Sequence, residues 1–181
     1  SIFEFLRVES DSIDLAQWDS IVVSPGWKES HPIIQAAQLA GVAILNEIDI
    51  AWEIHLEMAP SQKWVAITGT NGKTTTVEMA ASMLRSGGFH AIACGNVGET
   101  VISVVDQNDP YDYLVVELSS FQLHWSKKAQ FVSCAILNIA DDHTDWHGSF
   151  EKYAQAKISL LDRDSSKASC NILRSSGDMC K

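Results

Sequence analysis

The chain has 181 residues, of which 46% are hydrophobic and 20% charged, a composition typical of a globular protein. Its formal net charge of −10 argues against nucleic acid as a partner, because sequence-independent binding needs Lys and Arg side chains that meet phosphates. No apolar run reaches the roughly 20 residues of a membrane-spanning helix, and the four cysteines lack metal-ligand spacing. We therefore expect a cytoplasmic protein with reduced thiols and no membrane partner.

The first predicted unit is a β-α-β arrangement. Ile21–Val23 is a short β-branched run typical of a buried strand, and a Ser-Pro-Gly turn follows it. Apolar residues at helical spacing begin at Pro32 and stop before Gly41, as the preference for proline at the start and glycine after the end of a helix predicts. A second strand at 42–45 would be parallel to the first, with a right-handed crossover, and 48–58 is predicted to be another helix.

A second α/β unit is predicted to begin at Lys63, after a candidate linker at residues 59–62. Apolar strands alternate with helical patterns there, which favours an α/β fold with a mostly parallel sheet. The predicted strands are 64–67, 91–94, 113–118 and 131–138, and the predicted helices are 74–84 and 150–161. From Asp162 the periodicity fails, so we expect residues 164–181 to form a tail that is disordered or not native to the protein.

The strongest functional signal is a glycine-containing loop between a predicted strand and a predicted helix. Its sequence is Gly-x-x-Gly-Lys-Thr, and in such loops successive backbone N–H groups surround a phosphate at the positive end of the helix. The lysine would contact the β- and γ-phosphates of ATP, and the threonine hydroxyl would bind Mg²⁺. The candidate cofactor-binding residues are Gly69, Thr70, Asn71, Gly72, Lys73, Thr74 and Thr75.

This loop departs from the strict phosphate-loop pattern at one position. Ile67 stands where the pattern G-x-x-x-x-G-K-[ST] has its first glycine. The alternative interpretation is a tight turn closed by a capping threonine. A strand before the loop and a helix after it disfavour that alternative, so we expect a variant ATP-binding loop.

An acidic residue, Glu117, ends the strand predicted at 113–118. In open α/β sheets, ligands bind outside the carboxyl ends of the strands, so a carboxylate there, beside the phosphate loop, is placed to bind Mg²⁺. An ordinary acid at a strand end is the alternative. Ser119, Ser120 and Gln122 follow in what we expect to be a loop, where they would hydrogen-bond a polar substrate.

The polar run Asp141–Gly148 follows another predicted strand end. His143 is a candidate ligand of a second metal ion, oriented by the neighbouring acids, but a solvated turn explains the run equally well. Lys157 lies in the helix predicted at 150–161. The composition of that helix alone predicts that the lysine faces solvent.

Together these motifs resemble those of the Mur ligases. The run Gly69–Thr75 is similar to the ATP loop of this family, which also occurs in folylpolyglutamate synthases, and Glu117–Leu123 and Asn138–Ser149 resemble further family motifs. Phe121-Gln122 after Glu-Leu-Ser-Ser is typical of the members that add D-glutamate to UDP-N-acetylmuramoyl-L-alanine. Three shorter runs also resemble that type, namely Ser24–Gly26, His31-Pro32 and Gly95–Gly98.

The resemblance implies an ATP-dependent ligase of peptidoglycan synthesis that uses two Mg²⁺ ions. ATP would phosphorylate the acceptor carboxylate to an acyl phosphate, which the amine of D-glutamate would attack. Lys157 corresponds to a family lysine that is carbamylated and so gains a carboxylate. The implied catalytic residues are Lys73, His143 and Lys157, the metal ligands Thr74, Glu117, His143 and Lys157, and the substrate residues Ser24, Pro25, Gly26, Asn96, Ser119 and Gln122.

The resemblance also implies an incomplete set of domains. Residues 1–59 would be part of a Rossmann-like domain that binds the UDP-linked substrate, and 60–163 part of the P-loop ATPase domain, with the C-terminal amino-acid-binding domain absent. Asn46 stands where the family often has glycine. We expect a monomeric fragment that cannot complete ligation alone. The alternatives are a ligase like folylpolyglutamate synthase, which the Phe-Gln pair and Ser24–Gly26 disfavour, and a nucleotide-binding module without ligase activity.

Overall fold

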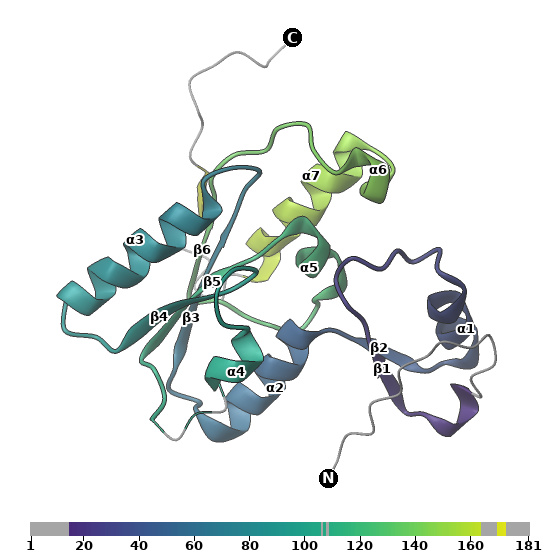
Figure 1. The fold of residues 1–181 in the computed structure, drawn as a ribbon, viewed down its shortest axis with the longest axis horizontal. Coiled ribbons are helices and arrows are strands. Elements are labelled where there is room, and N and C mark those ends of the chain that lie inside the picture. The colour runs from purple at the N-terminus through teal and green to yellow at the C-terminus, as the bar shows by residue number, and fades with distance from the viewer. Residues whose placement is uncertain (1–14, 106, 108, 164–169, 173–181) are drawn as a thin grey trace.

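A computed structural model gives the fold of residues 15–105, 107, 109–163 and 170–172, which are the residues described (Figure 1). The helices, with η for 3-10 helices, are η1 Leu15–Gln17, α1 Pro32–Ala40, α2 Glu47–Met58, α3 Lys73–Ser86, α4 Val101–Val105, α5 Ser120–Trp125, α6 Thr144–His147, α7 Phe150–Ile158 and η2 Ser159–Arg163. The strands are β1 Ser20–Val22, β2 Ala43–Leu45, β3 Lys63–Thr68, β4 Ala91–Gly95, β5 Tyr113–Glu117, β6 Ser133–Ile136 and β7 Cys170–Ile172. Within these residues, no helix combines the length and the apolar character of a membrane span.

Residues 15–45, here the N-terminal lobe, form the predicted β-α-β arrangement to one side of the larger sheet (Figure 1). Strands β1 and β2 pair in parallel, and α1 connects them. The side chain of His31 caps α1 by accepting a hydrogen bond from the N–H of Ile33 (3.3 Å), and Pro32 opens the helix. Gly41 ends it in the left-handed conformation, with φ +71°, which glycine adopts without strain.

The main sheet has the strand order β4-β5-β3-β6-β7, and every neighbouring pair is parallel. The predicted α/β fold with a parallel sheet is therefore confirmed. Strand β7 falls in the stretch 164–181, where we expected a tail without regular structure. The backbone of Cys170–Ile172 instead pairs with Cys134–Ile136 of β6 and extends the sheet.

Both faces of the sheet are covered, as parallel sheets require. Along β5, Leu114 and Val116 pack in the larger core cluster, with α2, α4 and α5. Val115 points to the opposite face and packs with Val77 and Ala81 of α3. The apolar runs of the sequence thus correspond to strands that are buried on both sides.

Helix α2 precedes the candidate linker in the chain but packs in the core of the main sheet. Its residues Ile48 and Ala51 belong to the same buried cluster as the sheet residues Trp64 and Leu114. The buried carboxylate of Asp49 also accepts hydrogen bonds from the Ser126 hydroxyl (2.8 Å) and from the backbone N–H groups of Lys127 (2.8 Å) and Lys128 (3.0 Å). Residues 59–62 are therefore a tight turn between packed elements, and the domain boundary at 59/60 stays a prediction.

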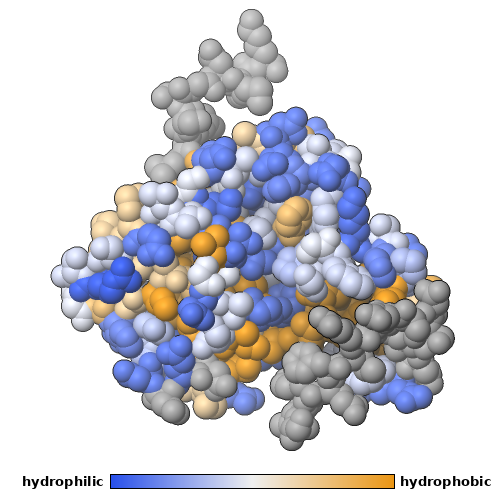
Figure 2. Space-filling model, in the orientation of Figure 1, coloured by the Kyte–Doolittle hydropathy of each residue, from blue (hydrophilic) through white to orange (hydrophobic). Residues whose placement is uncertain are grey.

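Figure 2 shows how the surface divides on the side of the molecule that faces the viewer. Hydrophilic residues cover α6 and α7, whereas apolar residues gather over α2, between α4 and the N-terminal lobe. The polar part lies at the end of the sheet where the strands β3, β5 and β6 finish (Figure 1). That end carries the predicted site residues other than Ser24–Gly26, which lie in the N-terminal lobe.

Candidate functional site

The predicted phosphate loop connects β3 to α3, as the sequence indicated. Gly72 immediately precedes the helix with φ +82°, so the chain turns sharply into the first turn of α3. A Cβ atom on Gly69 would lie 3.1 Å from the Cβ of Leu137, so the loop lies close to the segment after β6. The first N–H groups of a helix have no partner within it and carry the positive end of its dipole. The loop therefore has the geometry of an anion-binding site.

Asn138, just after β6, holds the loop in this shape. Its Oδ1 accepts hydrogen bonds from the N–H groups of Thr70 (3.1 Å) and Asn71 (2.9 Å), and its Nδ2 donates to the Asn71 carbonyl (3.0 Å). The Thr70 hydroxyl makes a further contact of 2.8 Å with the hydroxyl of Tyr153 on α7. We did not single out Asn138 or Tyr153 from the sequence. The position of Asn138 at the carboxyl end of a strand was the available signal.

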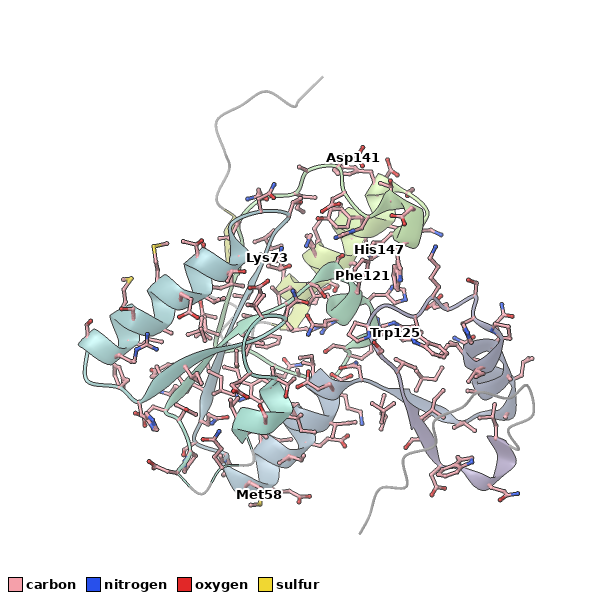
Figure 3. All side chains as sticks on the ribbon, viewed as in Figure 1. Met58, Lys73, Phe121, Trp125, Asp141 and His147 are labelled. Atoms are coloured by element: carbon pink, nitrogen blue, oxygen red, sulfur yellow. The ribbon has the colours of Figure 1, made fainter. Side chains whose placement is uncertain are left out.

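Lys73 lies at the start of α3, with its side chain near the loop (Figure 3). Its Nζ donates to the Thr70 carbonyl at 3.0 Å. This bond within the loop keeps the ammonium group beside the anion-binding N–H groups. A negatively charged phosphate would compete for the same ammonium group, because a charged acceptor forms the stronger hydrogen bond.

The side chains of Thr74 and Glu117, the two residues that we expect to bind one metal ion, contact each other directly. The Thr74 hydroxyl donates to Oε2 of Glu117 at 2.8 Å, and the Asn96 amide lies 3.3 Å from Oε1. Glu117 is only 1% exposed, and among the described residues its carboxylate has these neutral donors but no ion-pair partner. A buried carboxylate is costly without a cation. Hydroxyl and carboxylate oxygens are the donors that Mg²⁺ prefers, so the residues present fit that ion.

Lys157 is buried beneath the loop, although its composition alone predicted a lysine that faces solvent. It is 2% exposed, and its Nζ donates to the Gly69 carbonyl (3.0 Å) and to the Thr68 hydroxyl (3.3 Å). Burial, with a smaller effect of the nearby Lys73 ammonium, lowers the pKa of Lys157 to about 8. A substantial fraction of its amine is therefore neutral near physiological pH.

His143 lies just before α6, beside Asp142 and Phe121. It is exposed, has φ +51°, and its Nε2 is 3.5 Å from Oδ2 of Asp142. Its ring lies 4.7 Å from that of Phe121, measured between centroids. Among the described residues, no group of three His, Cys, Asp or Glu side chains is arranged to hold a metal ion. A second metal site with His143 stays a prediction.

The predicted loop after β5 is in fact the short helix α5, and the predicted polar turn after Asp142 contains α6. Ser119 and Gln122 cap α5 reciprocally, because the Ser119 hydroxyl accepts from the Gln122 N–H (3.1 Å) and Gln122 Oε1 accepts from the Ser119 N–H (2.9 Å). Ser120 is buried and lies 3.0 Å from Nε2 of His147. The side chains proposed for substrate binding thus also fix the helix in this structure.

The residues Ser24, Pro25 and Gly26 lie in the N-terminal lobe, in the segment between β1 and α1. The Gly26 carbonyl accepts a hydrogen bond from the indole Nε1 of Trp146 on α6 (2.8 Å). Figure 3 shows Phe121 and His147 close together at α5 and α6, and Trp125 on the side of α5 nearest the N-terminal lobe. The structure thus connects the segment 24–26 to the short helices that follow Glu117 and His143.

The fold and this site together define a P-loop nucleotide-binding α/β protein. Residues 67–178 match the family described as the Mur ligase middle domain, which covers more than half of the chain. The chain therefore belongs to the Mur ligase family. The matched range extends into the stretch 164–181 that we had expected to be a tail.

Curated relatives agree with this assignment. The chain is 50% identical over 144 residues to a UDP-N-acetylmuramoylalanine–D-glutamate ligase from Thermobifida fusca. The aligned residues make up 78% of this chain and 30% of the relative. It is 39% identical over 156 residues to the enzyme of the same name from Nocardia farcinica, covering 85% and 32%. The chain thus spans about a third of the length of these relatives.

Two solved structures share the fold. MurF from Acinetobacter baumannii superposes with a TM-score of 0.54 at 20% identity, over 72% of this chain and 31% of that chain. MurF ligase from Thermotoga maritima, solved in complex with ADP, gives a TM-score of 0.52 at 18% identity, over 85% and 45%. At these identities the likeness concerns the fold alone.

Proposed function

We propose that this chain carries the ATP-dependent chemistry of a ligase that joins D-glutamate to UDP-N-acetylmuramoyl-L-alanine. The observation that supports it best is the 2.8 Å contact between the Thr74 hydroxyl and the buried Glu117 carboxylate beside the phosphate loop. The choice of substrates rests on the name that the relatives from Thermobifida fusca and Nocardia farcinica share. We further propose that the protein is cytoplasmic and acts as a monomer.

The proposed reaction has two steps, because a carboxylate has no good leaving group. The γ-phosphoryl group of ATP is first transferred to the acceptor carboxylate, which gives an acyl phosphate and ADP. The amine of D-glutamate then attacks the acyl carbon, loses a proton and expels inorganic phosphate, which leaves an amide. Mg²⁺, when bound, neutralises charge on the phosphoryl group during transfer.

The residues of the loop and its neighbours have separate roles in the proposed reaction. Lys73 would exchange the Thr70 carbonyl for the transferring phosphate, and Thr74 and Glu117 would hold one Mg²⁺. The backbone N–H groups at the start of α3 would bind the phosphates of ATP, in a loop kept rigid by Asn138. Catalysis would come mainly from the position of these groups and from charge neutralisation.

We propose that Lys157 is carbamylated and that, with His143, it serves a second Mg²⁺. Carbamylation needs a neutral amine, and a pKa of about 8 leaves roughly a tenth of the amine neutral at pH 7. The ammonium first loses one proton. The lone pair of the neutral amine then forms a bond to the carbon of CO₂ while a C=O electron pair moves to oxygen, and the nitrogen loses a second proton, so a cation becomes an anion with two protons released. NMR of the protein in ¹³C-bicarbonate should show a carbamate signal that Lys157→Arg abolishes. A signal that survives the substitution would overturn this assignment.

The acceptor would bind between the N-terminal lobe and the ends of β4 and β5. We propose that Ser24, Pro25 and Gly26 line this site from the lobe. From the main sheet, Asn96 and the capping pair Ser119 and Gln122 would contribute, since they lie on the segments that follow the ends of β4 and β5.

The test is to measure which acceptor binds together with the nucleotide. Isothermal titration should give Mg²⁺-dependent binding of ADP, and Lys73→Ala should weaken it at least tenfold, because the phosphates lose their cation. Lys63→Ala is the matched control, because Lys63 is an exposed lysine that contacts Tyr113 at the other end of β3. Binding that is equally strong in the Lys73 variant would contradict the site.

Acceptor selectivity separates the proposed ligase from its alternatives. UDP-N-acetylmuramoyl-L-alanine should bind saturably, whereas a pteridine substrate of folylpolyglutamate synthase should not bind. Preference for the pteridine would replace the proposed function with that of the other ligase. Nucleotide binding with neither acceptor would favour a module without ligase activity.

A further inference from the structure

The segment Gly26–Lys28 of the N-terminal lobe is held by three contacts from the main part of the molecule. The indole Nε1 of Trp146 donates to the Gly26 carbonyl (2.8 Å), and the indole Nε1 of Trp125 donates to the next carbonyl, that of Trp27 (3.1 Å). The Lys28 ammonium donates in the reverse direction, to the Asp145 carbonyl (2.9 Å). Three consecutive residues are thus fixed from outside their own lobe.

The two indoles come from the short helices that adjoin the proposed active site. Trp125 is the last residue of α5, whose first turn is capped by Ser119, and Trp146 lies on α6, three residues after His143. Figure 3 shows Trp125 on the side of α5 that faces the N-terminal lobe. The connection therefore joins the Gly26–Lys28 segment directly to α5, which carries Gln122, and to α6, which follows His143.

Both indoles pack against neighbouring side chains, Trp125 as a buried residue and Trp146 as a half-buried one. Trp125 is 8% exposed and packs with Val23 and Ile34 of the N-terminal lobe. The ring of Trp146 lies 4.9 Å from that of Phe121 and 5.0 Å from that of His124, measured between centroids. A tryptophan fixed by its apolar ring presents its single N–H in one direction, which suits it to hold a carbonyl in place.

The hydrogen bonds of the segment within its own lobe are local, and they include one from the His31 N–H to the Lys28 carbonyl (3.0 Å). After β1 ends at Val22 the backbone is irregular up to α1, and the turn is closed by the bond from the Trp27 N–H to the Ser24 carbonyl (3.1 Å). This local bond shapes the turn but does not relate it to the phosphate loop. The contacts from Trp125, Trp146 and Asp145 fix where the segment lies relative to the main part of the molecule.

We propose that Trp125 and Trp146 are positioning residues that orient the Ser24–Gly26 turn for the acceptor substrate. They do not touch the reacting atoms; their N–H groups set where the turn lies relative to Glu117 and the phosphate loop. This inference rests on the proposed function, because it assigns the turn to the acceptor. It predicts that loss of the N–H groups weakens acceptor binding and leaves nucleotide binding unchanged.

The test replaces each indole by a ring without a donor. Trp125→Phe and Trp146→Phe each should raise the dissociation constant of UDP-N-acetylmuramoyl-L-alanine about fivefold, and the double variant more, whereas that of Mg²⁺–ADP should stay within about twofold. Trp52→Phe is the matched control, because Trp52 packs with His55 and Trp64, on the core side of α2. Unchanged acceptor affinity in the double variant, or equal weakening of both ligands, would overturn the proposal.

Amide hydrogen exchange without ligands gives a second and independent readout. Residues 23–31 should exchange faster in the double variant than in the wild type, while the phosphate loop and α3 exchange at the wild-type rate. Unchanged exchange in 23–31 would overturn the positioning role whatever the acceptor is. If the wild-type chain does not bind the acceptor but the exchange changes as expected, the proposed substrate is wrong and the positioning of the segment stands.

Discussion

Replacement of Gly95 by alanine tests whether the close approach of β4 to Glu117 shapes the proposed metal-binding part of the site. Gly95 ends β4 with φ +110°, and a Cβ atom on it would lie 2.4 Å from the Glu117 carbonyl oxygen. The same oxygen accepts a hydrogen bond from the N–H of Asn96 at 3.0 Å. An alanine must therefore push the turn after β4 away from Glu117 and weaken that bond.

The magnitude follows from two separate costs. A positive φ costs a residue with a side chain about 1–2 kcal/mol, and overpacking against the backbone costs about 1–3 kcal/mol more. Gly95→Ala should therefore lower the free energy of unfolding by about 2–5 kcal/mol. Gly98→Ala is the matched control, because Gly98 has φ +77° but a Cβ there meets nothing within 4 Å. Gly98→Ala should therefore lower the free energy of unfolding only by the cost of the positive φ, about 1–2 kcal/mol.

Urea denaturation of the two variants measures the difference, and titration with Mg²⁺–ADP measures its effect on the site. Because the Asn96 amide lies 3.3 Å from the Glu117 carboxylate, displacement of the turn should also weaken Mg²⁺-dependent binding in Gly95→Ala. Gly98→Ala should bind as the wild type does. Equal losses of stability in the two variants would refute the reasoning, because the crowding at Glu117 would then have no consequence.

Two further predictions concern buried polar groups outside the loop. In urea titrations, Asp49→Ala should lower the free energy of unfolding by about 3 kcal/mol, because the Ser126 hydroxyl and the N–H groups of Lys127 and Lys128 lose their acceptor. The control is Glu53→Ala at an exposed position, which should change the free energy of unfolding by less than about 1 kcal/mol. Burial, with smaller effects of neighbouring positive groups, lowers the pKa of His147 to about 4. The unfolded imidazole takes up its proton near pH 6.5, so a shift from pH 7 to pH 4 should destabilise the wild type by on the order of 2–3 kcal/mol more than His147→Gln. Identical pH dependence of unfolding in the two proteins would contradict this.

The parts of the fold that the sequence predicted are those with strong local signals. The apolar runs of β3 and β5, the loop at Gly69 and the helix that follows it depend on neighbouring residues, and the structure confirms them. Gly72 has φ +82°, a left-handed conformation that the turn of this loop needs and that glycine adopts without strain. Glu117 was singled out because its apolar run ends there and ligands of open α/β sheets bind outside the carboxyl ends of the strands.

What the sequence did not predict depends on contacts between distant segments. Helices α5 and α6 have only six and four residues, too few to be stable alone, so they form where caps and packing support them. Lys157 looked like a surface lysine because nothing nearby in sequence shows that the Gly69 carbonyl lies over its Nζ. Strand β7 is likewise determined by its pairing with β6, which no local pattern encodes.

The arrangement of the site follows from the alternation that also packs the sheet. In the parallel register Ile67 of β3 pairs with Glu117 of β5, and both side chains point to the face that α3 covers, as Val115 does. Thr74, in the first turn of α3, therefore reaches the Glu117 carboxylate. A slip of one residue along β5 would place the apolar Val116 at that level and turn Glu117 into the opposite core. The same apolar pattern that gives the sheet its register thus fixes where the carboxylate stands beside the phosphate loop.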